Sequence, residues 1–283
     1  MHSAPLHRSQ VLASPWAGVY ATHIASARHY GRHWHATYGL GMIDEGAQLS
    51  ASGRGDVEAY AGDLIATNPG EVHDGRPLGA ASRRWRIVFF DAAVLAAMAG
   101  GDCAGTEITR PVIRDPRLGG ALARLLACIE AWNRSRCTEV DRLACEESLV
   151  QTCALLRDLH SNRGISHDAG ADVIRIRDRL ADDPVDVPSL GELATMAGLS
   201  KYQLIRRFQK VYGLTPHAWL IQLRAERARA SIHQGLALAT AASVSGFADQ
   251  SHMTRIFMRQ FGFTPGAWQK AARGGAAITF KTA

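Results

Sequence analysis

The sequence predicts an α+β protein with an N-terminal β-barrel, a helical hairpin, and a C-terminal all-α domain that contains two helix-turn-helix motifs. Three observations predict this class. Short apolar runs separated by Gly, Asp, Pro and Asn occupy residues 19–88, leucines at helical spacing occupy residues 117–160, and one motif occurs twice after residue 190. A chain of 283 residues is long enough for two domains, each with its own core.

The strands of the N-terminal half are predicted from apolar runs at close intervals. The runs lie at residues 38–43, 57–60, 63–67 and 85–90. Turn residues bound each of them, which is typical of a jelly roll or a small barrel.

The region from residue 117 to residue 160 is predicted to form a helical hairpin. One apolar stripe consists of Leu118, Leu122, Leu125, Leu126 and Ile129, and a second consists of Leu143, Leu149, Val150, Leu156 and Leu159. The hairpin either packs against the barrel or forms a dimer interface. We expect a sensor domain over residues 1–160, a linker over residues 161–171, which are rich in Ser, Asn, Gly and Asp, and a second domain over residues 172–283.

The repeated motif describes a helix, a tight turn and a second helix. Gly198 and Gly246 begin the matching turns, and the two copies are offset by 48 residues at this glycine and by 49 at the later Phe. Each copy ends in Gly-x-Thr-Pro-x-x-Trp. Ser189, Ser200 and Asp249 stand where helix N-caps are expected. Two such units are two helix-turn-helix motifs, whose second helices can enter a DNA major groove.

The segment between the two copies is predicted to be one helix over residues 217–234, with Pro216 at its start and Gly235 at its end. Eighteen residues would span about 27 Å. Successive major grooves on one face of DNA are about 34 Å apart. One chain could therefore place two recognition helices on one face of a duplex without dimerising.

Net positive charge is confined to the repeat-bearing end. Residues 184–283 hold 12 Lys and Arg against 4 Asp and Glu, whereas residues 1–171 hold 17 against 18. This distribution is what a phosphate-binding surface requires.

The second copy, from Gly246-Phe-Ala-Asp-Gln-Ser-His-Met to Gly262-Phe-Thr-Pro265, closely resembles the signature of the AraC/XylS family of bacterial transcription regulators, and residues 172–272 follow that family's arrangement. By this resemblance, bases are contacted from the first recognition helix by Tyr202, Gln203, Ile205 and Arg206, and from the second by Gln250, Ser251, His252, Thr254 and Arg255. These side chains suit the task, because Arg pairs with guanine and Gln with adenine. The expected phosphate contacts are Lys201, Arg207, Lys210 and Arg259.

Two segments, His33-Trp-His35 and residues 62–73, resemble the half-motifs of cupin barrels. The resemblance implies a small-molecule effector pocket, with candidates His33, His35, Tyr38, His73 and Arg86, and Trp85 beside them. Cupin enzymes add a Glu to three His ligands, and that Glu is missing here. No cofactor is required, although His33, His35 and His73 could hold Zn²⁺ or Fe²⁺.

The remaining expectations concern location and partners. No apolar stretch is long enough to span a membrane, the N-terminus lacks a signal-peptide core, and five cysteines without Cys-x-x-Cys spacing favour the cytoplasm. Expected partners are double-stranded DNA, a small-molecule effector, RNA polymerase and a second copy in a homodimer.

The leading interpretation is a ligand-responsive transcription regulator with no enzymatic activity. One alternative is a metal-dependent cupin enzyme fused to a DNA-binding module. Another is a constitutive DNA-binding protein whose barrel senses nothing.

Overall fold

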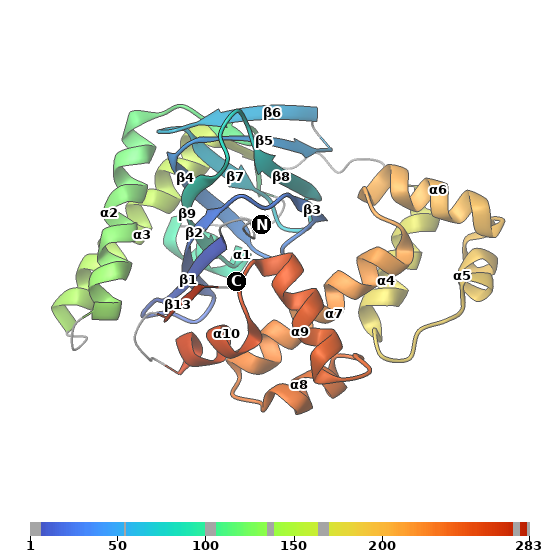
Figure 1. Cartoon of the computed structure of the whole chain (residues 1–283). Helices are drawn as coiled ribbons and strands as arrows, with labels where there is room; N and C mark the ends of the chain where they lie inside the picture. Colours follow the sequence, from blue (N-terminus) through green and yellow to red (C-terminus); the bar gives the residue numbers. More distant parts are fainter. Residues whose placement is uncertain are drawn as a thin grey trace.

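The computed structural model describes residues 7–53, 55–99, 106–134, 139–163, 170–273 and 278–281. Its fold is mixed α+β, with an antiparallel N-terminal sheet domain and a C-terminal helical domain (Figure 1). The strands are β1 (His7–Ala13), β2 (Val19–Ser26), β3 (Tyr30–His33), β4 (Tyr38–Glu45), β5 (Ala47–Ser52), β6 (Gly55–Tyr60), β7 (Leu64–Thr67), β8 (His73–Pro77), β9 (Arg83–Phe90), β10 (Thr106–Ile108), β11 (Val112–Ile113), β12 (Ser161–Arg163) and β13 (Ile278–Lys281). The helices are α1 (Ala92–Ala99), α2 (Pro116–Arg134), α3 (Glu139–His160), α4 (Ala171–Asp182), α5 (Leu190–Ala197), α6 (Lys201–Tyr212), α7 (Pro216–His233), α8 (Leu238–Val244), α9 (Gln250–Phe261) and α10 (Pro265–Ala272).

The described strands form two larger antiparallel sheets. The seven-stranded sheet has the order β11-β7-β4-β9-β2-β1-β13, and the four-stranded sheet has the order β3-β8-β5-β6. The four predicted strands are confirmed as β4, β6, β7 and β9. The strand β13 was not expected, because the sequence predicted a helical C-terminal part. It pairs with β1 and so covers an edge that would otherwise be open.

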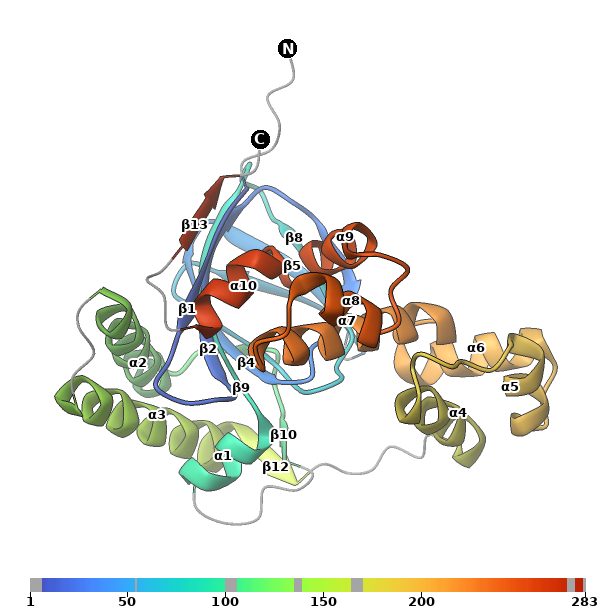
Figure 2. The same cartoon turned by 90° about the horizontal axis from the view of Figure 1, so that it is seen from below.

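The predicted helical hairpin is confirmed as α2 and α3, which lie together beside the sheets (Figures 1 and 2). The stripe of α2 that begins at Leu118 is fully buried in the same core as Leu40 and Phe90 of the seven-stranded sheet. The second stripe was partly wrong. Leu149 and Leu156 are buried, but Val150 and Leu159 are exposed, because α3 turns only one narrow face toward α2 and the core.

Both helix-turn-helix motifs form as predicted. Ser189 and Ser200 close capping boxes on α5 and α6, and the Asp249 side chain accepts from the His252 amide at the start of α9. Gly198 and Gly246 adopt φ values of 65° and 82°. These left-handed conformations favour glycine and allow the tight turn between the helices.

The connecting helix is α7, which has 18 residues and lies one residue earlier than predicted. Thr215 caps it and Pro216 occupies its first turn. The expected linker over residues 161–171 begins as β12, which pairs with β10, whereas residues 164–169 lie outside the described ranges. No helix in the described part of the chain is long and apolar enough to cross a membrane.

The C-terminal helices pack against the sheet domain at two places. Val11, Tyr20 and Phe89 of the sheets share a core with residues of α7 to α10. Trp34 and Val72, which lie in loops of the sheet domain, share another core with α4 to α7. Each helix-turn-helix unit is therefore in contact with the domain that precedes it.

Candidate effector pocket and DNA interface

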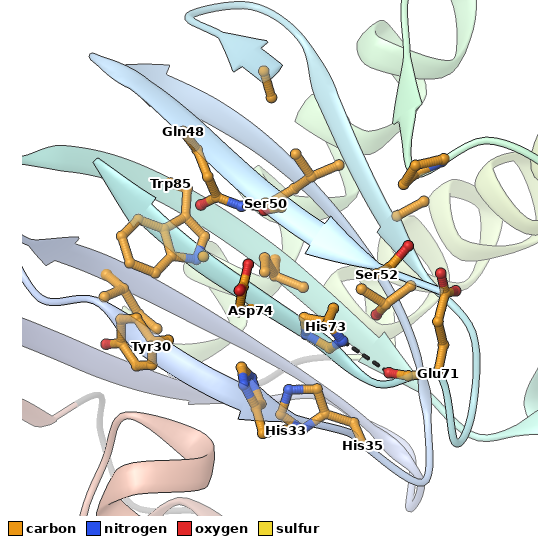
Figure 3. A pocket seen from close by; sticks show the side chains of 18 of the residues that line it. Tyr30, His33, His35, Gln48, Ser50, Ser52, Glu71, His73, Asp74 and Trp85 are labelled. Carbon is orange, nitrogen blue, oxygen red and sulfur yellow. Dashed lines mark hydrogen bonds between the residues drawn. The ribbon is translucent and has the colours of Figure 1, made fainter. Parts of the chain in front are cut away.

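A pocket lies between the two sheets and the C-terminal end of α9. Its sheet-domain lining includes Tyr30, His33, His35, His73 and Trp85, which Figure 3 shows on the surrounding strands and loops. Its remaining wall comes from the DNA-binding half of the chain, through Gln260, Phe261 and Phe263. The space inside, with its mouth, is about 940 Å³. Its combination of apolar side chains with a few polar groups is typical of a small-molecule site.

Three imidazoles gather at one end of this pocket (Figure 3). One ring nitrogen from each of His33, His35 and His73 lies within 4.8 Å of the others. The Nδ1–H of His33 donates to the Gly31 carbonyl at 2.7 Å, and the Nδ1–H of His73 donates to the Glu71 carbonyl at 2.9 Å. In a neutral ring this leaves Nε2 as the nitrogen with a lone pair.

These three rings are neutral at physiological pH. Burial lowers the pKa of His33 to about 3, and the nearby His73 adds to that effect. Burial, together with the proximity of His33 and His73, lowers the pKa of His35 well below its usual value. Burial also lowers the pKa of His73. The cluster therefore presents lone pairs rather than positive charge to the pocket.

The positive charge of the pocket comes from Arg83, which the sequence analysis did not select. Its side chain is 2% exposed and lies over the ring of Trp85, 4.6 Å from the ring centre. Nε donates to Gln48 Oε1 at 2.8 Å and Nη1 to the Arg28 carbonyl at 3.1 Å. Burial lowers the pKa of Arg83 to about 10, so it stays charged near neutral pH. Within the described ranges, no carboxylate forms an ion pair with it.

Tyr38 and Arg86, both predicted for the pocket, lie elsewhere. Tyr38 is buried on the opposite face of β4 and donates its hydroxyl to the Thr106 carbonyl. Arg86 points toward α2 and pairs with Asp44 at 2.8 Å and Glu130 at 3.5 Å. Side chains alternate along a strand. Trp85 and Arg86 of β9 therefore cannot face the same pocket, and this alternation would have selected Arg83.

The tripeptide His33-Trp34-His35 connects the pocket to both DNA-binding halves. Trp34 points away from the pocket and stacks on Trp219 of α7, with ring centres 5.7 Å apart. Its amide donates to Gln222 Oε1 of α7 at 3.0 Å, and its carbonyl accepts from Gln260 Nε2 of α9 at 3.1 Å. The backbone of this loop is thus bonded to the connecting helix and to the second recognition helix.

The first recognition helix, α6, presents most of its predicted contacts to solvent. Lys201, Gln203, Arg206 and Lys210 are exposed, and Ile205 is half-buried. The side chain of Tyr202 lies outside the described set. Arg207, predicted to contact phosphate, forms an ion pair with Asp172 of α4. Gln203 Oε1 accepts from the Ser200 amide, so this side chain also caps its helix.

The second recognition helix, α9, is divided along its length. Its N-terminal half presents the exposed side chains of Gln250, Ser251 and Arg255, with His252 and Thr254 half-exposed beside them. Arg259 is also exposed. Its C-terminal end turns inward, where Gln260 and Phe261 line the pocket. One helix therefore carries both a predicted base-contacting face and a wall of the pocket.

Comparisons with known proteins agree with this division. Residues 17–152 match the AraC-like ligand binding domain family, and residues 193–271 match the helix-turn-helix domain family. The chain is 26% identical over 226 residues to the HTH-type transcriptional regulator YbfI of Bacillus subtilis (strain 168), which covers 78% of this chain and 80% of that protein. It is 33% identical over 134 residues to the transcriptional activator NphR of Rhodococcus sp, which covers 46% of this chain and 37% of that protein.

The whole fold also has a counterpart among solved structures. Unsaturated fatty acid bound wild-type ToxT from Vibrio cholerae strain SCE256 superposes with a TM-score of 0.52 at 11% identity, covering 98% of this chain and 99% of that chain. At this identity the likeness concerns the fold alone. The two matched domains, their order and the relatives that share them show that the chain belongs to the AraC/XylS family of transcriptional regulators.

Proposed function

We propose that the chain is a sequence-specific DNA-binding regulator whose effector is a small organic anion bound in the pocket beside Arg83, and that it acts by binding rather than by catalysis. The observation that carries the proposal is the composition of the pocket wall. A ligand that enters it contacts the sheet domain and, through Gln260, Phe261 and Phe263, the second helix-turn-helix unit. Because the ligand contacts both domains, its affinity depends on how they are arranged relative to each other. Effector control requires such a difference in affinity between two arrangements.

The class of effector is inferred from Arg83. A buried guanidinium without a carboxylate partner is costly unless a ligand supplies one. Ile24, Val57, Ile87 and Phe89 add apolar side chains to the lining, which also includes the carboxylates of Glu71 and Asp74 near the histidine cluster. An apolar body with one carboxylate fits this combination, and the fatty acid named for ToxT belongs to the same chemical class.

The DNA contacts of the proposal are the side chains predicted from the family resemblance. The exposed faces of α6 and α9 support them, because Gln203 and Arg206 on one helix, and Gln250, Ser251 and Arg255 on the other, are open to solvent. We propose in addition that the DNA-bound protein contacts RNA polymerase and forms a homodimer through α3. The exposed Val150 and Leu159 on that helix support the second point.

The test uses a promoter fragment obtained by genome-wide mapping of bound sites. DNA affinity is measured by fluorescence anisotropy with oleate as the probe and with oleyl alcohol as its uncharged match. We expect oleate to bind the full-length protein and change its DNA affinity, and the alcohol to have little effect. Failure of the wild-type protein to bind any mapped site would overturn the proposed function itself.

The role of Arg83 is tested by making the same substitution at Arg83 and at the adjacent Arg84. Arg83→Gln should weaken oleate binding by at least tenfold, since a hydrogen bond between charged groups contributes roughly 1.5–3 kcal/mol. Arg84→Gln removes an adjacent cation that points outward, where it pairs with Glu45 on the surface, and should leave oleate binding unchanged. Equal losses in the two variants would contradict an anion site at Arg83. Circular dichroism of both variants checks that they fold.

A further inference from the structure

We propose that His33, His35 and His73 form a binding site for one divalent transition-metal ion, with Zn²⁺ as the fitting ion and one coordination position open to the pocket. His33 ends β3, His35 lies two residues later in the following loop, and His73 begins β8. Their ligating nitrogens converge within 4.8 Å. Neutral imidazole is the ligand that Zn²⁺ accepts in sites of three protein ligands.

The bonds around the cluster are those that orient metal-ligating histidines. His33 and His73 each donate Nδ1–H to a backbone carbonyl, which fixes the ring and turns Nε2 outward from that carbonyl. In known metal sites, a histidine that binds the metal through one ring nitrogen usually donates the N–H of the other to a carbonyl, a carboxylate or water. The third ring, His35, has a buried Nδ1 for which the described residues offer no hydrogen-bond partner. A buried, unpartnered nitrogen beside two oriented imidazoles is costly without a ligand to accept its lone pair or proton.

The distances need only a small adjustment. Tetrahedral Zn²⁺ with bonds of about 2.0–2.1 Å places its nitrogen ligands about 3.4 Å apart. The separations of up to 4.8 Å therefore have to shrink by roughly 1.4 Å at most, which rotation of the imidazole side chains can supply. The ring centres of His33 and His73 are already 4.5 Å apart.

The carboxylates near the cluster leave the fourth position to an outside ligand. Glu71 Oε2 accepts from the amide and the side chain of Asn68 at 3.2 and 2.9 Å, and Asp74 Oδ1 accepts from the Ala51 amide at 2.6 Å. Three protein ligands with an open position facing a pocket is the pattern of a site that binds an exchangeable ligand. The open position here faces the apolar space that Arg83 also lines.

Binding is tested on full-length protein purified without a histidine tag and stripped with a chelator. Co²⁺ is titrated as the probe, because its visible absorption reports tetrahedral coordination, and Zn²⁺ is then added as competitor. We expect one Co²⁺ per chain, displaced by Zn²⁺, and a higher melting temperature in either metal. Absence of saturable binding at one ion per chain would overturn the site.

The ligands are identified with matched substitutions. Removing a group that hydrogen-bonds to a metal ligand costs about 10–100-fold in metal affinity, so loss of a ligand itself in His73→Gln or His35→Gln should cost more than about 100-fold. His29→Gln makes the same change at an exposed histidine near this loop and should leave Co²⁺ binding unchanged. Equal affinity in all three variants would show that Co²⁺ binds elsewhere. Having two ligand variants keeps the test decisive if one of them fails to fold.

A consequence for DNA binding rests on the proposed function. Two ligands flank Trp34, whose ring and backbone are held by α7 and α9. A metal ion that draws His33 and His35 together should shift Trp34 against Trp219 of α7. Because α7 and α9 hold Trp34, this shift should change the affinity for DNA. The experiment compares anisotropy with and without Zn²⁺ in wild type and in His35→Gln. Zn²⁺ that binds without changing DNA affinity would refute the coupling, whereas absence of DNA binding by the wild type both with and without Zn²⁺ would refute the proposed function.

Discussion

His7 joins the first strand of the sheet domain to the turn that follows α9. Its Nε2–H donates to the Gly262 carbonyl at 2.9 Å, and its Nδ1 lies 3.0 Å from the Ser26 hydroxyl. Burial lowers the pKa of His7, the Gly262 carbonyl opposes this change, and Arg28 adds to it. The imidazole therefore holds the two domains together in its neutral form.

This bond predicts a loss of stability in mild acid. The folded-state pKa of His7 is below the value of about 6.5 expected for the unfolded chain, so the unfolded state binds more protons as the pH falls. The contribution of His7 is complete above about pH 6.5 and is lost below it. We expect the melting temperature to fall between about pH 7.5 and about pH 5, and to fall less steeply in His7→Gln. The exposed His29→Gln should follow the wild type, and an unchanged slope in His7→Gln would contradict the assignment.

The sequence predicted the role of a single residue where that role depends on residues close by in the chain. The caps Ser189, Ser200 and Asp249 were found because a cap acts on an amide three residues away. Arg207 could not be placed, because its partner Asp172 is 35 residues distant and lies on another helix. The histidines of the pocket were found from the resemblance of their two segments to cupin half-motifs, although nothing in the sequence showed that Phe261 would join them.

At the scale of one element, Gly198 ends α5 in a left-handed conformation with φ of 65°. Gly198→Ala should destabilise the protein by about 1–2 kcal/mol, because a Cβ disfavours this backbone conformation. Gly266 lies in the first turn of α10, and a Cβ there would meet open space. Gly266→Ala should therefore stabilise by about 0.5–1 kcal/mol. Urea unfolding of the two variants measures both changes, and the same sign in both would contradict this account.

Elements were predictable where hydrophobic spacing is local. The connecting helix α7 was placed to within one residue, because Pro216 begins it and an apolar face runs through it. The sheet order was not predictable, because β4 lies between β7 and β9 through pairings distant in sequence. The outer face of α3 was misjudged, since Val150 and Leu159 fit a helical stripe that none of the described residues covers.

At the scale of the whole molecule, the basic C-terminal part predicts steep salt dependence of DNA binding. Each phosphate contact contributes about 0.9 to the slope of log K against log salt concentration. Lys210→Ala should lower the magnitude of that slope by about 0.9 while keeping the preference among sequences. Lys270→Ala removes an exposed lysine of α10, outside both recognition helices, and is the matched control. A larger effect at Lys270 than at Lys210 would place the phosphate surface elsewhere.

The division into a sheet-rich half and a helical half followed from the spacing of apolar residues and from the repeated motif, whereas the contact between the halves did not. Tyr20 stacks on Phe89 within the sheet domain and meets Trp268 of α10 edge-on. Aromatic residues of this kind look like ordinary core residues of separate domains when only the sequence is read. Their shared core places the end of α9 in the pocket wall, and that position is what allows one ligand to contact both functions.

The pairing of β1 with β13 has a consequence for how the protein is made. The first described strand, β1, pairs with β13, which is synthesised after both recognition helices. During translation the outer edge of β1 therefore stays open until residues 278–281 have left the ribosome, and an open edge is a place where chains aggregate. A ribosome that stalls before residue 278 therefore leaves the sheet domain with an unpaired strand edge at β1.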